Sequence, residues 1–179
     1  MCGIFGVASR FDGQVAKIIL EGLKKLEYRG YDSVGIATVF KDRIYLKKSS
    51  GKIRELEKKL HFENLPGKVG IGHTRWATHG IPNDINSHPH TDCKGTIAIV
   101  HNGILENYLE LKKFLLKKGH FFRSDTDTEV FAHLLEEYVK EEDSFFNAFK
   151  RALKMIKGSY AFAIITTFEP NKIFFARKH

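Results

Sequence analysis

The order of the apolar segments along the chain is the feature that most restricts its fold. Strand-like runs come in adjacent groups, and helical patterns stand between the groups instead of after every strand. Parallel strands need a crossover connection, usually a helix, whereas antiparallel strands can follow one another through short turns. The order therefore predicts an α+β fold with antiparallel sheets covered by helices, and it argues against a doubly wound parallel sheet.

Periodicity locates the individual elements. Apolar residues three or four positions apart predict helices, and short apolar runs bounded by turn residues predict strands. We expect strands over residues 4–8, 33–40, 43–48, 69–73, 96–101, 160–167 and 172–176. We expect helices over residues 14–28, 53–60, 105–118, 130–138 and 144–157, and a capping box at residues 126–129 to begin the fourth of them.

The chain reads as one domain, because its 179 residues contain no repeat, no low-complexity tract and no linker. Two cysteines, Cys2 and Cys93, do not make a disulfide framework, so we expect a reducing, cytoplasmic setting. No stretch approaches the roughly 18 apolar residues of a membrane-spanning helix, and we expect no membrane association.

The net charge of +8 raises the question of a nucleic-acid partner. The lysines recur as pairs on helical stretches with glutamates among them, and no basic stripe is interleaved with aromatic residues. A solvated surface explains this pattern, so we expect no binding to DNA or RNA.

Cys2 is the sharpest chemical feature. Removal of Met1 would leave a thiol and an α-amine on one residue. A free thiol titrates near about 8.5 and an α-amine near about 7.7–8.0, so the amine can accept the proton of the thiol near neutral pH. Taken alone, Cys2 is explained more simply as a small buried thiol.

Other segments combine groups that can bind an amino acid. Residues 72–80 hold Arg75, whose guanidinium suits a carboxylate, beside the only tryptophan, Trp76. Asn102 and Gly103 follow a strand, and their amide donors are suited to an oxyanion hole. A tryptophan-anchored turn and a plain Asn-Gly turn account for the same residues without any function. Asp127 either belongs to a helix cap or holds an ammonium group.

A metal site is a further possibility, because His88 and His90 stand near Cys93. Structural zinc takes four ligands, and these three residues do not match the usual pairs of ligand spacings. We therefore expect no metal ion.

Taken together, the segments resemble the glutaminase domain of the class II glutamine amidotransferases. The blocks that carry the resemblance are CGIFGV, LEYRGYDSVGIA, HTRWATHG, NSHPH, HNGILENY and SDTDTEVFAHL, in one order. Within this family the chain is most similar to the glucosamine-6-phosphate synthases (glutamine–fructose-6-phosphate aminotransferases). The resemblance implies the N-terminal-nucleophile hydrolase fold, with two antiparallel sheets sandwiched between helical layers.

The resemblance also implies a role for each site residue. Cys2 attacks the side-chain amide of L-glutamine and forms a thioester, and its own amine relays the proton. Asn102 and Gly103 stabilise the oxyanion, Arg75 binds the α-carboxylate of the substrate, and Asp127 binds its α-ammonium group. The residues expected to line or support the pocket are Arg29, Trp76, Thr78, His79 and His88. No cofactor is implied.

A larger, homo-oligomeric parent enzyme is implied as well. The chain stops just after a strand, so we expect residues 1–179 to be a glutaminase domain shortened at its C-terminal end. The absent sugar-phosphate isomerase domain would use the ammonia to make glucosamine 6-phosphate from fructose 6-phosphate. Two alternatives stay open: the glutaminase domain of another class II amidotransferase, and a non-catalytic glutaminase-like binding domain. Cys2, Arg75, Asn102 and Asp127 argue against the second alternative.

Overall fold

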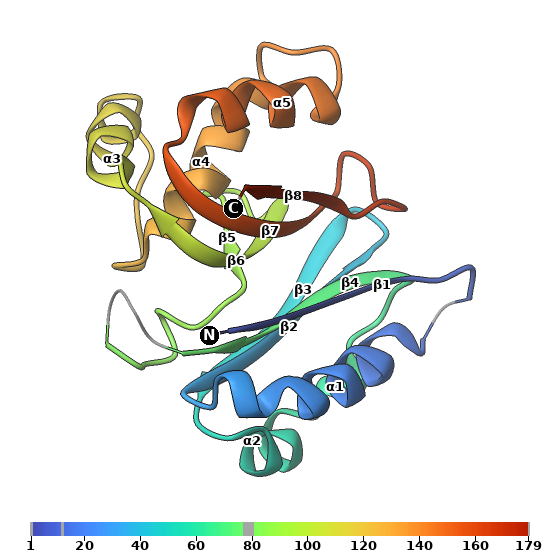
Figure 1. The fold of residues 1–179 in the computed structure, drawn as a ribbon. Coiled ribbons are helices and arrows are strands. Elements are labelled where there is room, and N and C mark those ends of the chain that lie inside the picture. The colour runs from blue at the N-terminus through green and yellow to red at the C-terminus, as the bar shows by residue number, and fades with distance from the viewer. Residues whose placement is uncertain (1, 12, 77–80, 179) are drawn as a thin grey trace.

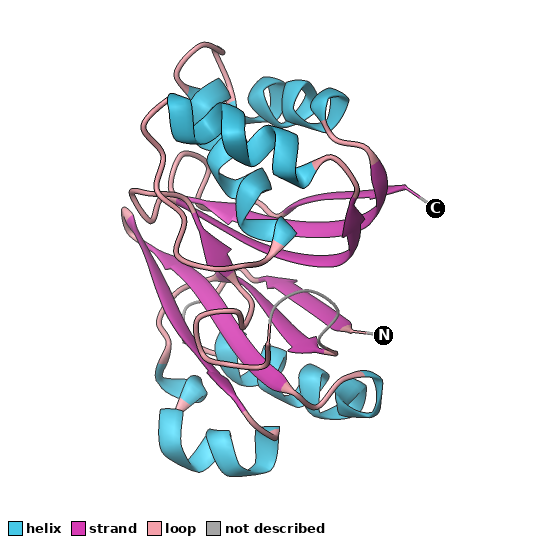
Figure 2. Ribbon diagram, turned by 90° about the vertical axis from the view of Figure 1, so that its left-hand side faces the viewer, coloured by secondary structure: helices cyan, strands magenta, loops and turns pink. Residues whose placement is uncertain are grey.

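Two four-stranded antiparallel sheets lie face to face, and helices cover the outer face of each sheet (Figures 1 and 2). The computed structural model describes residues 2–11, 13–76 and 81–178. Its four layers confirm the α+β fold that the order of apolar segments predicts.

The first sheet has the strand order β1-β4-β2-β3. Its strands are β1 (Gly3–Ala8), β2 (Ser33–Phe40), β3 (Arg43–Ser50) and β4 (Val69–Arg75). It is covered by α1 (Val15–Leu26), η1 (Glu27–Arg29), α2 (Ile53–Leu60) and η2 (Phe62–Asn64). The predicted hairpin of β2 and β3 is confirmed, and Lys41 takes a positive φ of 53° in its turn.

The second sheet has the order β5-β6-β7-β8. Its strands are β5 (His90–Thr91), β6 (Ile97–Leu105), β7 (Gly158–Thr166) and β8 (Phe174–Lys178). Its outer layer consists of α3 (Tyr108–Lys117), α4 (Asp127–Val139) and α5 (Phe145–Met155). Within the described ranges, no helix combines the length and the apolar character that crossing a membrane requires.

Alternation of side chains along the strands divides the apolar residues among three cores. Val34 and Ile36 of β2 point towards α1, whereas Ala37 and Val39 point towards the other sheet. The core between the sheets is built from small and β-branched residues: Ala37, Val39, Val69, Ile71, Ala98, Val100, Ala163 and Ile165. Because central strands are buried on both faces, they read in the sequence as nearly continuous apolar runs.

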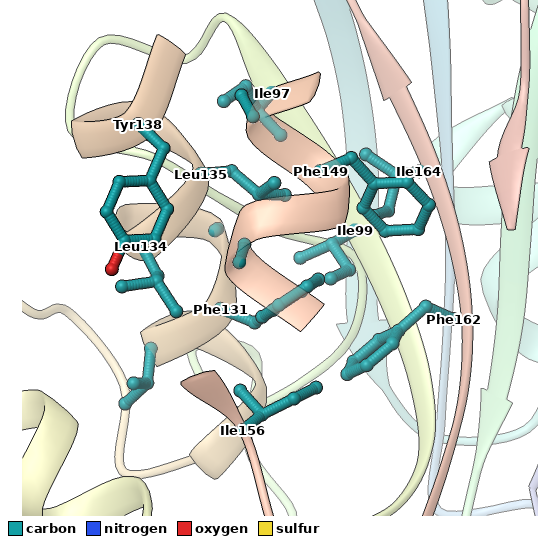
Figure 3. Close-up of a cluster of buried hydrophobic side chains, with 14 of the residues drawn as sticks. Ile97, Ile99, Phe131, Leu134, Leu135, Tyr138, Phe149, Ile156, Phe162 and Ile164 are labelled. Carbon is teal, nitrogen blue, oxygen red and sulfur yellow. The ribbon is translucent and has the colours of Figure 1, made fainter. Parts of the chain in front are cut away.

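The largest core lies between the second sheet and its helices (Figure 3). Phe131 of α4 stacks on Phe162 of β7, with ring centroids 4.5 Å apart and planes 13° from parallel. Leu134 and Leu135 continue the apolar surface of the helix. Full burial of each such side chain stabilises the fold by about 1.5–3 kcal/mol, and it fixes the position of α4 on the sheet.

One boundary differs from the prediction in a way that matters for function. β6 continues to Leu105, so Asn102 and Gly103 lie within a strand, opposite Ala161 and Tyr160 of β7. The interpretation as a plain Asn-Gly turn is therefore wrong. Gly103 has a φ of 134°, and a Cβ at this position would lie 2.1 Å from the carbonyl oxygen of Ser159. Glycine here permits a close strand contact and does not reverse the chain.

The capping box is also wrong in its bonding, although α4 begins where it was predicted. The Thr126 side chain makes no capping hydrogen bond, and its hydroxyl instead lies 3.0 Å from His90 Nε2. The Glu129 carboxylate reaches past Thr126 and accepts hydrogen bonds from the backbone N–H groups of Arg123, at 2.8 Å, and Ser124, at 2.7 Å. Tertiary contacts have replaced the local cap.

Gly35 of β2 provides a test of the contact between the first sheet and the segment before β5, which contains His88. A Cβ on Gly35 would lie 2.1 Å from the carbonyl oxygen of His88 and 2.6 Å from Lys48 Cβ. We predict that Gly35→Ala lowers the free energy of unfolding by about 1–3 kcal/mol, measured by denaturant titration. Gly6→Ala is the matched control, because its nearest obstacle is the flexible end of Ile173 at 3.3 Å. Equal losses in the two variants would contradict this contact.

Candidate active site

A cavity of about 630 Å³ opens where Cys2, the end of β4, β6 and the start of α4 meet. Every predicted site residue within the described part of the chain lines it: Cys2, Arg29, Arg75, Trp76, His88, Asn102, Gly103 and Asp127. Thr78 and His79 lie outside the described residues. The predicted residues, from Cys2 to Asp127, thus share one cavity of the size usual for small-molecule sites.

Cys2 immediately precedes β1 and is held against the end of β4. The backbone N–H of Trp76 donates to Cys2 Sγ at 3.2 Å, and the thiol lies 3.5 Å from the Trp76 carbonyl oxygen. The N–H of Gly3 donates to Thr74 Oγ1 at 3.1 Å, beside the β1–β4 pairing. Burial raises the pKa of the Cys2 thiol, and the hydrogen bond from Trp76 opposes this shift only in part. Near neutral pH the thiol therefore needs a base.

Asn102 presents an amide donor towards Cys2. Asn102 Nδ2 donates to the carbonyl oxygen of Cys2 at 2.9 Å. His73 Nε2 lies 3.1 Å from Asn102 Oδ1 and 3.1 Å from the carbonyl oxygen of His101. Both of these partners are acceptors, so His73 Nε2 carries the proton. This bond fixes the Asn102 amide with its NH2 group on the side of Cys2.

Two histidines that line the cavity, His73 and His88, are held neutral. The rings of His73 and His88 stack 4.3 Å apart, and His88 Nδ1 accepts a hydrogen bond from the N–H of His101 at 3.3 Å. Burial lowers the pKa of His73 to about 3 and the pKa of His88 well below its usual value. Groups that are this weakly basic orient their neighbours but are poor acceptors for a thiol proton.

Two side chains of opposite charge reach the cavity from different layers. Arg75 ends β4 and is buried, which lowers the pKa of its guanidinium. Asp127 is the first residue of α4, and its Oδ2 accepts a hydrogen bond from the N–H of Leu105 at 2.8 Å. A Cβ on Gly30 would lie 2.6 Å from the carbonyl carbon of Arg75, so glycine lets the turn that carries Arg29 lie against the end of β4. The opposite charges of Arg75 and Asp127 suit the carboxylate and ammonium groups of an amino acid.

Sequence reasoning missed part of the cavity lining. Ser159, Tyr160 and Ala161 come from β7, and Arg177 comes from β8. They reach the cavity because β7 pairs with β6 opposite Asn102 and Gly103, and β8 pairs with β7. Only the strand pairing itself could have identified them.

A family of known proteins matches this chain. The model for the glutamine amidotransferase domain matches residues 73–179. A glutamine–fructose-6-phosphate aminotransferase (isomerizing) of Pyrococcus horikoshii is 57% identical over 99% of this chain and 29% of its own length. That of Pyrobaculum aerophilum is 54% identical over 99% of this chain and 30% of its own length. The chain thus spans about three tenths of the length of these curated relatives.

Solved structures agree with the family match. A glutamine phosphoribosylpyrophosphate amidotransferase from B. subtilis, complexed with ADP and GMP, is 31% identical with a TM-score of 0.79. The superposition covers 93% of this chain and 35% of that one. A glutamine aminotransferase class-II domain protein from Silicibacter pomeroyi has a TM-score of 0.58 at 14% identity and covers 98% of this chain and 76% of its own, so it supports the fold alone.

Lys48 donates hydrogen bonds to the segment that carries His88, and the sequence analysis did not predict this role. Its amine donates to the carbonyl oxygens of Ile85 at 3.1 Å, Ser87 at 2.6 Å and Pro89 at 3.2 Å. Burial lowers the pKa of Lys48 to about 8. The three hydrogen bonds tie the chain before β5 to β3 and so support the stacking of His88 on His73.

We predict that Lys48→Met lowers the free energy of unfolding by about 1.5–3 kcal/mol, because carbonyl groups lose a charged donor. The measurement is denaturant unfolding at neutral pH. Lys47→Met is the matched control, since Lys47 donates to the exposed carbonyl oxygen of His61, at 2.7 Å. A loss no larger than that of the control would mean that Lys48 does not hold the segment.

Proposed function

This chain belongs to the glutamine amidotransferase domain family, and we propose that its Cys2 releases ammonia from L-glutamine. The Cys2 sulfur forms a bond to the side-chain carbonyl carbon, the bond from that carbon to nitrogen breaks, and ammonia leaves with the proton of the thiol. Water then cleaves the thioester, which releases glutamate and restores the thiol. The observation that carries the proposal is the Asn102 amide donor held against Cys2 in a cavity that also contains Arg75 and Asp127.

The proton acceptor in this proposal is the α-amine of Cys2. A free α-amine titrates near about 7.7–8.0, so it accepts the thiol proton near neutral pH. The low basicity of His73, whose pKa lies at about 3, argues against that neighbouring ring as the base. The proposal therefore requires that Met1 is removed, since an amide nitrogen at Cys2 cannot accept a proton near neutral pH.

Asn102 and Gly103 are the proposed donors to the oxyanion that forms when the thiolate adds to the amide. Two features support Asn102: its NH2 group already lies 2.9 Å from the carbonyl oxygen of Cys2, and His73 fixes its orientation. Gly103 follows Asn102 along β6 and lines the same cavity. Donors of this kind act mainly in the transition state, where the loss of one typically costs about 10²–10³ in rate.

Arg29, Trp76 and His88 support the pocket walls in this proposal.

The larger reaction is also a proposal. Relatives about three times as long are glutamine–fructose-6-phosphate aminotransferases by name. We place residues 1–179 as the glutaminase domain of such an enzyme, in which a sugar-phosphate isomerase domain receives the ammonia and converts fructose 6-phosphate to glucosamine 6-phosphate. A homo-oligomeric parent and a cytoplasmic location belong to the same proposal. A glutaminase domain serving a different acceptor is the alternative, and an assay of the full-length protein with fructose 6-phosphate distinguishes the two.

Substrate recognition is tested by changing the two charged residues. We predict that Arg75→Lys and Asp127→Asn each raise KM for glutamine at least about tenfold, because one charge-assisted contact is worth about 1.5–3 kcal/mol. Steady-state release of glutamate is the measurement, and circular dichroism checks the fold. Arg151→Lys is the control, because Arg151 pairs with Glu141 and Glu142 on the surface. Unchanged KM in both site variants would contradict the assignment.

Processing of the N-terminus tests the base. We predict that chains retaining Met1 release no glutamate, whereas chains beginning at Cys2 are active. Intact-mass spectrometry and a glutaminase assay on the same preparations provide the measurement. Cys2→Ala, with Met1 removed, sets the inactive baseline. Full activity in a preparation that uniformly carries Met1 would overturn the role of the free amine.

A further inference from the structure

Four side chains outside the cavity converge as metal ligands do. They are Cys93, in the turn between β5 and β6, His120, in the connection after α3, and His133 and Glu136, which lie three residues apart on α4. One ligand atom from each lies within 4.8 Å of all the others. We propose that this cluster binds a divalent transition-metal ion, with zinc as the best match to its chemistry.

Five of the six distances between the ligand atoms are close to those around a tetrahedral ion, and the sixth, between Cys93 Sγ and Glu136 Oε2, is within 4.8 Å. Bonds of about 2.0–2.1 Å to nitrogen or oxygen and about 2.3 Å to sulfur place tetrahedral ligand atoms roughly 3.3–3.6 Å apart. Cys93 Sγ lies 3.6 Å from His120 Nδ1 and 3.4 Å from His133 Nδ1, and these two nitrogens are 3.3 Å apart. Glu136 Oε2 lies 3.1 Å from His120 Nδ1 and 3.6 Å from His133 Nδ1.

The second nitrogen of each histidine provides independent support. His120 Nε2 lies 3.0 Å from Glu137 Oε1, and His133 Nε2 lies 3.4 Å from Glu129 Oε1. A proton on Nε2 of each ring satisfies these carboxylates, and this tautomer leaves the lone pair of Nδ1 available to an ion in the cluster. Carboxylates orient metal-binding histidines in this manner.

Charge and burial favour a metal ion over a network of hydrogen bonds. The side chains of His120, His133 and Glu136 are 3%, 1% and 8% exposed. Two Nδ1 atoms, a thiol sulfur and a carboxylate oxygen face one another there. The N–H of Cys93 donates to Glu136 Oε2 at 3.1 Å, and a cation would satisfy the lone pairs that remain in this buried cluster. One divalent ion neutralises a thiolate and a carboxylate together and accepts all four lone pairs. Thiolate sulfur, imidazole nitrogen and carboxylate oxygen are each ligands that zinc takes in proteins.

The earlier expectation of no metal ion rested on a different set of residues. His88 is turned away to stack on His73, and His90 Nε2 lies next to the hydroxyl of Thr126. Cys93 instead meets side chains that come 27 and 40 positions later in the chain. Four protein ligands leave no open coordination position, so the role we assign to the ion is structural. It joins the β5–β6 turn and the α3–α4 connection to α4, whose first residue is Asp127.

The test is metal content and cobalt spectroscopy on the whole chain. Protein from zinc-supplemented cells should contain about one zinc per chain by elemental analysis. Titration of the metal-free protein with Co²⁺ should produce the intense visible bands of four-coordinate cobalt and a thiolate-to-cobalt band in the near ultraviolet. Zinc should raise the melting temperature of the metal-free protein, because an ion that binds only the folded state stabilises it.

Paired variants identify the ligands. Cys93→Ser and His133→Gln should lose the metal and the thiolate band, whereas Cys2→Ser, which removes the other thiol, should keep both. The proposal is overturned if Cys93→Ser retains the band or if Cys2→Ser loses it. A wild-type chain that folds, contains no zinc and gives no thiolate band with cobalt overturns it as well, and that result depends on no variant.

Discussion

The face-to-face packing of the two sheets is the contact on which the site depends. Small and β-branched side chains let the sheets approach along the core that includes Ala37, Val39, Ala98 and Val100. This approach brings the end of the first sheet to β6, so that Asn102 Nδ2 lies 2.9 Å from the carbonyl oxygen of a residue 100 positions earlier. The nucleophile comes from one sheet and its proposed oxyanion donors come from the other. A change in the spacing of the sheets would therefore separate Cys2 from Asn102, even if the strand pairing within each sheet stayed the same.

Buried polar groups link the two sheets at the site, and their protonation follows from their burial. His73 of β4 contacts the backbone of β6 and fixes Asn102, while His88 stacks on its ring. Desolvation keeps His73 neutral, with a pKa of about 3. Burying polar rings costs free energy unless they are hydrogen-bonded. Their contribution is therefore orientation of the site, and in our account the proton chemistry is left to the amine of Cys2.

Local patterns in the sequence predicted much of the fold. The β2–β3 hairpin and the α1 and α5 helices follow from short-range periodicity and turn residues, which the structure confirms. The position of Asn102 and Gly103 inside a strand was missed, because an Asn-Gly pair fits a turn equally well. The three carbonyl contacts of Lys48 and the meeting of Cys93 with His133 were also missed, since they depend on chain segments 37 to 41 residues apart. The motif blocks record residue identity, so they identified residues that line the cavity. They do not record contacts, so they revealed neither the hydrogen bonds of Lys48 nor the neighbours of Cys93.

Trapping of an acyl-enzyme tests the central claim most directly. The protein is mixed with glutamine, quenched in acid within one turnover, digested, and mapped by mass spectrometry. Our account predicts a glutamyl group bound as a thioester on the peptide that begins with Cys2, in chains that have lost Met1. Steady release of glutamate without any adduct at Cys2, or with the glutamyl group on Cys93 instead, would contradict it.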